Sequence, residues 1–277
     1  MPAADAPCPE QAFNATALKW HTCAWLLLPV LVFLAGWMHW YAALPLTLLT
    51  AAGLAPRKRK EPQTRDSLPA FPLFTRSSFL ALAAFAALMA LSGWGEWVNQ
   101  HPDHIVRNAC LRELVASPWP VIFPDGNVLI YNTGFWLVPA LAGKLAGLDA
   151  ARMLVVLWGA WGLFLSWLWL CVFSGRRSLL LALLMAAFGS LLNLQCWLGL
   201  NLFRLHYFGT AEQIMCSANA SIPVLLFFIF LASGRMPLYW MPILFAATAF
   251  YSPLAALGGL PLAACQWRRQ WKGVLPL

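Results

Sequence analysis

The feature that most constrains this chain is a run of 32 residues, 24–55, that contains no aspartate, glutamate, lysine or arginine. About 20 apolar residues are enough for one membrane-spanning helix, so a single tilted helix would be too long. Tryptophan and tyrosine favour the edge of a bilayer, and the residues around Met38, His39 and Trp40 therefore predict a break between two short helices. One broken helix that overhangs the bilayer is the alternative.

The composition extends this conclusion to the whole chain. Of 277 residues, 61% are hydrophobic and 10% are charged, whereas roughly a quarter of the residues in a soluble domain are charged. A soluble globular enzyme and a disordered chain are therefore both excluded. Further apolar segments lie at 77–94, 153–173, 178–198, 221–232 and 238–265, the last broken at Tyr251, Ser252 and Pro253. We predict an all-α polytopic transmembrane helical bundle of about eight crossings, with residues 1–277 forming a single transmembrane domain.

The formal net charge of +8 would suit nucleic acid, but the position of the basic residues favours another explanation. A basic cluster lies between two apolar segments, where positive charge marks the cytoplasmic side of a membrane protein: Arg57, Lys58, Arg59, Lys60 and Arg65. We therefore expect no nucleic-acid partner, and we expect cytoplasmic tails at residues 1–23 and 266–277. The same cluster could also contact anionic lipid headgroups.

Two polar segments are predicted to lie outside the cytoplasm. Residues 95–127 form the first external loop, in which Pro102 and Asp103 begin a short interfacial helix. Residues 201–219 form the second. Residues 128–147 are apolar but interrupted. If Arg176 and Arg177 are cytoplasmic, this stretch is re-entrant or interfacial.

Ionisable side chains are costly in a membrane unless they face water, each other or a ligand, so those of the external segments are the functional candidates. We predict that the two segments meet in a pocket for the headgroup of a lipid-linked substrate. Asp103 is the candidate catalytic base, and arginines would hold phosphate. The candidate substrate-binding residues are Glu96, Arg107, Arg204 and His206.

Most of these candidates also have a plainer explanation. Asp103 and Arg107 stand four residues apart, so an exposed ion pair on a helix would account for both. Glu96 would simply have reached water at the end of a span, and His206 would be an interfacial hydrogen bonder. His101 and His104 flank one carboxylate, for which a solvated cluster is the better interpretation, so no metal site is assigned. The seven cysteines show no CxxC motif or ligand spacing.

Several short motifs carry a resemblance to a known family. The sequences of residues 103–108 (DHIVRN), 111–114 (LREL) and 117–121 (SPWPV) resemble the D-W-x-K-H-N, L-R-D-L and P-W-P-V motifs in the first external loop of the bacterial GT-C glycosyltransferases. Residues 131–144 are similar to the stretch that follows in that family, and residues 251–253 and 260–261 to its later W-S-P and L-P motifs. The likeness runs from Asp103 to Pro261.

The resemblance implies a protein of the bacterial inner membrane that moves a sugar from a polyprenyl-phosphate donor to an acceptor on the external face. Asp103 would be the base, and Arg204 and Arg107 would hold donor phosphate. His104 stands where the family has Trp, Val106 and Arg107 stand where it has Lys and His, and the chain is shorter than usual. In residues 218–223, similar to a P-Q-H-A-L-P motif, alanine replaces the histidine. These departures put the activity in doubt more than the fold.

The expected partners are membrane lipid, a polyprenyl-phosphate-linked sugar, an unidentified acceptor and, as an alternative, another protein. A divalent cation is compatible with the resemblance, although the sequence shows no clear ligand set for it. The competing functions are a non-catalytic or truncated relative that acts as a partner subunit, and a transporter of an amphipathic solute. A transporter would place charges or broken helices near the middle of the membrane, where this sequence has almost no charge.

Overall fold

The computed structural model describes residues 15–55, 75–98, 100–188 and 209–272. Across these ranges the regular secondary structure is helical, apart from one β-bridge between Ile122 and Val128. The all-α prediction is therefore confirmed for the described part of the chain. Three of the described helices are long and apolar enough to cross a membrane: α1 (Ala15–Trp37), α6 (Leu148–Ser174) and α9 (Thr210–Ala232).

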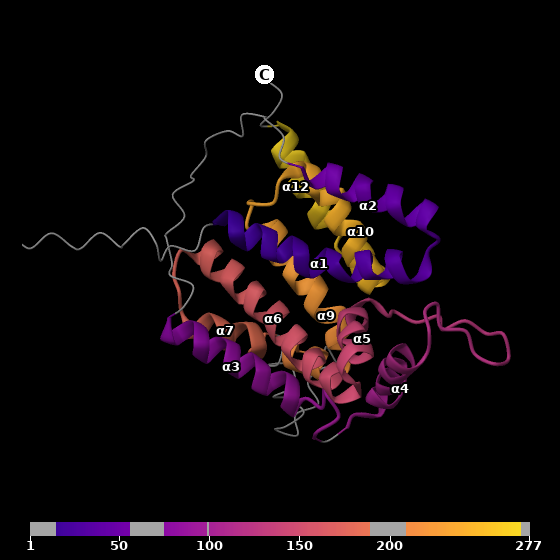
Figure 1. The fold of residues 1–277 in the computed structure, drawn as a ribbon. Helices are drawn as coiled ribbons and strands as arrows, with labels where there is room; N and C mark the ends of the chain where they lie inside the picture. Colours follow the sequence, from indigo (N-terminus) through magenta and orange to yellow (C-terminus); the bar gives the residue numbers. More distant parts are fainter. Residues whose placement is uncertain (1–14, 56–74, 99, 189–208, 273–277) are drawn as a thin grey trace, which may run out of the picture.

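The predicted break in the first apolar run is confirmed. α1 ends at Trp37, and α2 (Trp40–Leu54) begins after His39, whose backbone is extended. α2 then folds back along α1 (Figure 1). No side chain of α2 is buried, although most of them are apolar. Such a helix is suited to contact with lipid rather than with water.

α6 lies at the centre of the bundle, packed against α3 (Arg76–Leu91), α5 (Gly134–Ala146) and α9 (Figure 1). The close approach of α1 and α9 to α6 depends on Gly162. A Cβ added there would lie 2.6 Å from Ile222 Cγ2 and 2.7 Å from Trp25 Cζ2. Small residues let apolar helices approach closely, and van der Waals attraction between the packed side chains then stabilises the pair.

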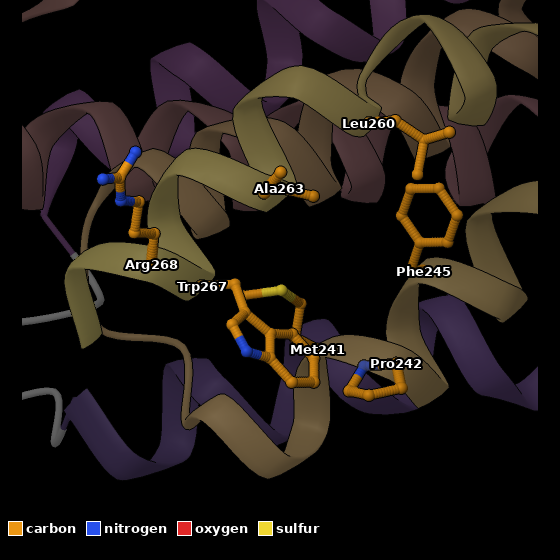
Figure 2. Close-up of a pocket in the computed structure, with 8 residues that line it drawn as sticks. Met241, Pro242, Phe245, Leu260, Ala263, Trp267 and Arg268 are labelled. Atoms are coloured by element: carbon orange, nitrogen blue, oxygen red, sulfur yellow. The ribbon is translucent and has the colours of Figure 1, made fainter. Parts of the chain in front are cut away.

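The other described helices of the second half of the chain are shorter. α7 (Leu179–Ala187) precedes α9, and η2 (Leu238–Trp240), α10 (Met241–Tyr251), α11 (Pro253–Gly258) and α12 (Leu260–Lys272) follow it. The predicted break near Tyr251 is confirmed, because Ser252 is extended and Pro253 starts α11. Proline lacks the backbone N–H that a continuous helix would need at that point. α10 and α12 enclose an apolar groove (Figure 2).

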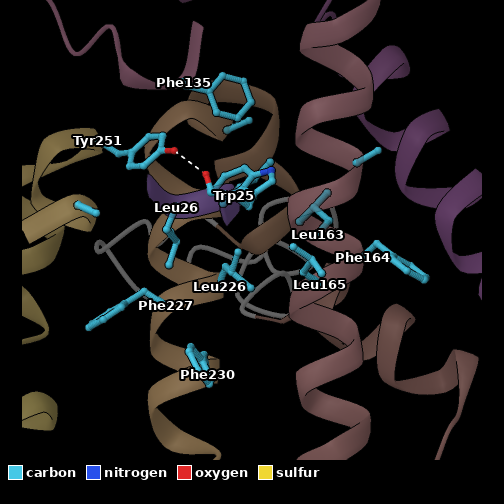
Figure 3. Close-up of a cluster of buried hydrophobic side chains, with 14 of the residues drawn as sticks. Trp25, Leu26, Phe135, Leu163, Phe164, Leu165, Leu226, Phe227, Phe230 and Tyr251 are labelled. Carbon is cyan, nitrogen blue, oxygen red and sulfur yellow. Dashed lines mark hydrogen bonds between the residues drawn. The ribbon is translucent and has the colours of Figure 1, made fainter. Parts of the chain in front are cut away.

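Aromatic residues with polar atoms join three helices in the core. The ring of Trp25 in α1 is stacked on Trp158 of α6, with centroids 5.1 Å apart, and on Tyr251 of α10, at 5.8 Å. Trp25 Nε1 donates to the carbonyl oxygen of Trp158 at 3.0 Å. Tyr251 Oη donates to the carbonyl oxygen of Trp25 at 3.1 Å (Figure 3). Buried polar atoms need such partners, so these bonds fix how the helices lie against one another.

The sequence placed the start of one helix wrongly. α9 begins at Thr210, not at 221, so a large part of the predicted second external segment is helical. The helix is kinked at Ser217, where φ is −154° and ψ is 47°, and the turns before the kink belong to the same helix as the apolar turns after it. The turns before the kink carry the polar residues Glu212 and Gln213, so their hydropathy does not identify them as part of an apolar helix.

The structure describes all or part of three other predicted segments. The short helix predicted in the first external loop is α4 (Pro102–Ala116), and its interfacial position stays a prediction. α5 covers Gly134–Ala146 within the ambiguous stretch. Its 13 residues extend about 20 Å, less than the roughly 30 Å of a hydrocarbon core. This length suits a re-entrant or interfacial helix. The segment 178–198 contains α7, and its remainder lies outside the described residues.

Candidate functional site

The acidic side chains of the described residues gather at one end of the bundle. They follow α3, lie on α4 and the loop after it, or begin α6 and α9, and these segments lie at the same end of the bundle in Figure 1: Glu96, Asp103, Glu113, Asp125, Asp149 and Glu212. The opposite ends of the same helices carry arginine, with Arg76 at the start of α3, Arg177 after α6 and Arg235 after α9. The candidate site is therefore at the acidic end.

α4 is positioned by its first turn and by an unusual buried face. Pro102 occupies the first turn, and the ring of His101 caps the helix by accepting a bond from the backbone N–H of Asp103 at 3.3 Å. The buried face includes His104 and Arg107 beside apolar residues, whereas Ile105 is 70% exposed. The expectation of a solvated His101 and His104 cluster is thus wrong for His104, which is 1% exposed.

The kink of α9 explains why polar residues are buried there. A break in a helix frees backbone carbonyls that then need other donors. Trp94 Nε1 donates to the carbonyl oxygen of Ile214 at 2.8 Å, and His104 Nε2 lies 2.8 Å from that of Met215. A carbonyl can only accept, so Nε2 of His104 carries the proton and Nδ1 is the acceptor. That Nδ1 atom is buried and has no hydrogen-bond partner within the residues that the structure describes.

Arg107 is the most unusual charge of this end. Its side chain is buried, lies 5.8 Å from the centre of the Trp94 ring and has Nη2 3.6 Å from Asp103 Oδ2. Its Nε and Nη1 atoms are buried and have no hydrogen-bond partner among the described residues. Asp103 itself is 53% exposed. A buried guanidinium with unsatisfied N–H groups is costly, and these groups could donate to an anion such as a phosphate.

Asp103, His101 and Cys216 form a row that is not a nucleophilic triad. Cys216 Sγ lies 3.9 Å from His101 Nε2, and His101 Nδ1 lies 3.7 Å from Asp103 Oδ2. However, His101 Nδ1 accepts the bond from the backbone N–H of Asp103. The neutral ring therefore carries its proton on Nε2, which faces the sulfur and cannot take the thiol proton.

Glu96 is held by two arginines rather than by water. Its side chain is 9% exposed, and Oε2 lies 2.5 Å from both Arg112 of α4 and Arg152 of α6. The residue has a φ of 67° and directly follows Gly95, whose φ is 90°. Burial opposes ionisation of this carboxyl, but hydrogen bonds from Arg112 and Arg152 outweigh it and hold the pKa of Glu96 below its ordinary value. The interpretation of an acid that had simply reached water is therefore wrong.

The other predicted site residues are placed differently. Arg204 and His206 lie outside the described residues. Glu212, an acid of the same predicted external segment, is the third residue of α9 and accepts a bond from the backbone N–H of Gly209 at 3.0 Å. Within the described part of the chain, no group of three or more His, Cys, Asp or Glu side chains could hold a metal ion.

Comparisons with known proteins identify no relative of this chain. No protein-family model matches this sequence, and no curated protein or solved structure is significantly similar to it. The chemistry of the acidic end therefore rests on the contacts of its own residues.

Sequence reasoning missed two residues that organise this end. Trp94 bonds to α9, faces Arg107 and contacts His104, with ring centroids 5.1 Å apart. Nothing in its position distinguishes it from the other tryptophans near helix ends. Arg152 binds both Glu96 and Asp149. The spacing of Asp149 and Arg152 at the start of a helix could have indicated a local ion pair, but not the contact with Glu96.

The burial of His104 predicts a pH-dependent stability. Burial lowers the pKa of His104, and the nearby charge of Arg107 acts in the same direction. The unfolded chain then binds a proton more readily than the folded one, so stability is complete above the ordinary histidine pKa of about 6.5 and falls as the pH drops below it. We expect a lower Tm at pH 5.5 than at pH 7.5 in detergent. His104→Gln, which keeps a donor for Met215, should reduce this difference, and an unchanged difference would assign it to other groups.

Proposed function

We propose that the chain is a multi-pass protein of a bacterial inner membrane with about eight crossings. Three long apolar helices and the shorter apolar helices α2, α3 and α10 support this topology. The positive-inside rule places the end with Arg76, Arg177 and Arg235 in the cytoplasm, together with both chain termini. The acidic end, with α4 at its membrane interface, then faces the outside.

We further propose that the acidic end transfers a sugar from a polyprenyl-phosphate donor to an acceptor, as the resemblance to the GT-C glycosyltransferases implies. The observation that carries this proposal is Arg107, whose Nε and Nη1 atoms find no hydrogen-bond partner in the described part of the chain and which lies beside the half-exposed Asp103. A phosphate at Arg107 would satisfy those donors. Arg204 and His206, which lie outside the described residues, would complete the substrate contacts, and Glu96 would act indirectly by holding α4 and α6 together.

In the proposed reaction, Asp103 and Arg107 have different roles. An acceptor hydroxyl attacks the anomeric carbon of the sugar while Asp103 takes its proton, and the bond from that carbon to the phosphate oxygen breaks. Arg107 then stabilises the negative charge of the departing polyprenyl phosphate. The distance of 3.6 Å between Asp103 and Arg107 is longer than a hydrogen bond, so neither group is fully engaged by the other.

A non-catalytic partner subunit is the second candidate. It is favoured by the same pair, because two opposite charges one helical turn apart on α4 need no substrate to explain them. In that case the free donors of Arg107 would have no phosphate to bind.

Binding of polyprenyl phosphate tests the proposed site. The purified protein in detergent should bind it more tightly than the neutral polyprenol of the same length, measured by native mass spectrometry. Arg107→Gln should weaken the affinity for the phosphate by at least about tenfold, because hydrogen bonds to charged groups are lost. Arg107→Lys should lose part of the affinity, since lysine keeps the charge but not the planar donors. Equal affinity for the phosphate and the neutral lipid would refute the site.

A further inference from the structure

The opposite end of the bundle contains a separate feature, an open groove of about 400 Å³ between α10 and α12 (Figure 2). α10 contributes Met241, Pro242 and Phe245 to its wall. α10 begins shortly after Arg235, so this part of the groove belongs to the basic end. The volume lies within the range of pockets that hold small ligands.

α12 supplies the other wall with one face of the helix. Leu260, Ala263, Ala264 and Trp267 recur at the spacing of one helical face, and all of them line the groove. The two alanines leave space in the middle, while Trp267 remains 42% exposed. Water that fills an apolar groove finds few hydrogen-bond partners there, and the side chains that line an empty groove lack van der Waals contacts on that side. In a membrane, an acyl chain is the apolar group available to fill it.

Charge at one end of the groove indicates which lipid would be bound. Arg268 is the charged residue among those that line it, and it lies at the end away from Leu260 and Phe245 (Figure 2). Arg269 and Lys272 follow in the same helix. All the acids of the described residues belong to the other end of the bundle. Guanidinium groups bind phosphate well, and basic residues beside tryptophan are typical of the membrane interface.

We propose that this groove binds one acyl chain of an anionic phospholipid whose phosphate contacts Arg268. The chain would lie along the alanines toward Leu260 and Phe245, and the headgroup would remain at the basic surface. This site is independent of the proposed sugar transfer, because it shares no residue with the acidic end.

The test compares two phospholipids with identical acyl chains on the full-length protein in detergent. Native mass spectrometry should show tighter binding of phosphatidylglycerol than of phosphatidylcholine. Arg268→Gln should weaken phosphatidylglycerol binding about fivefold and leave phosphatidylcholine binding unchanged. Ala264→Phe should weaken the binding of both lipids, because the ring would occupy the groove.

Two control variants address general effects of charge and size. Arg76→Gln removes an exposed arginine outside the groove, and Ala84→Phe enlarges an exposed alanine on α3. Both should bind the two lipids as the unaltered protein does. Equal binding of the two phospholipids would overturn the proposal, as would an effect of Arg268→Gln or Ala264→Phe no larger than that of its control.

Discussion

Asparagine at position 103 is expected to remove most of the proposed sugar transfer while the protein remains folded in the membrane. The amide keeps the shape of the carboxylate but cannot accept a proton, and loss of a catalytic base typically costs about 10²- to 10⁴-fold in rate. The side chain of Asp103 is 53% exposed, so its ion pair with Arg107 contributes less than about 1 kcal/mol to stability. Membranes that contain the variant would be assayed for transfer of labelled sugar from a polyprenyl-phosphate donor.

The same variant separates the two candidate functions. Glu113→Gln is a suitable control, because Glu113 is on the same helix and its carboxylate accepts a bond from Ser117 Oγ. If Asp103 is the base, Asp103→Asn should lower the rate but not the affinity for polyprenyl phosphate, since Arg107 loses a competing negative charge. If the pair is only structural, the rate should match that of the Glu113 control. That result would withdraw the transferase mechanism.

The helix boundaries that could be predicted from the sequence are those set by local chemistry. Pro102 and Asp103 define the start of α4, and Pro253 defines the start of α11. In both cases a proline occupies the first turn. Its missing backbone N–H would have no partner inside the helix, so this signal does not depend on distant residues. The break before Trp40 was likewise predictable, because an apolar run of that length does not fit one span.

The buried charges could not be predicted in the same way, because their partners are far away in the sequence. Glu96 meets Arg152 across 56 positions, and His104 meets Met215 across 111 positions. The second contact also depends on the kink at Ser217, for which the sequence offers no proline or glycine at that position. Local spacing therefore indicated a solvated loop, whereas the structure buries polar side chains at the acidic end of the bundle.

Glutamine at position 96 is expected to lower the stability of the protein more than any other single change of an acid among the described residues. Glu96 joins the loop after α3 to α4 through Arg112 and to α6 through Arg152. Removing one partner of a buried ion pair typically costs about 3–5 kcal/mol, but Arg112 is 55% exposed and can turn to water. We therefore expect a loss of about 2–3 kcal/mol, or roughly 5–10 °C in Tm, measured by thermal unfolding in detergent.

Asp149→Asn is the matched control, because Asp149 binds the same Arg152 but is itself 91% exposed. It should lower the Tm only slightly, since an exposed ion pair contributes little. Combining Glu96→Gln with Arg152→Gln should cost less than the sum of the two single changes, because the first already leaves Arg152 without its buried partner. Equal Tm values for Glu96→Gln and Asp149→Asn would mean that the two guanidiniums do not hold α4 against α6. The position of Arg107 would then depend on the packing of Trp94 and His104 alone.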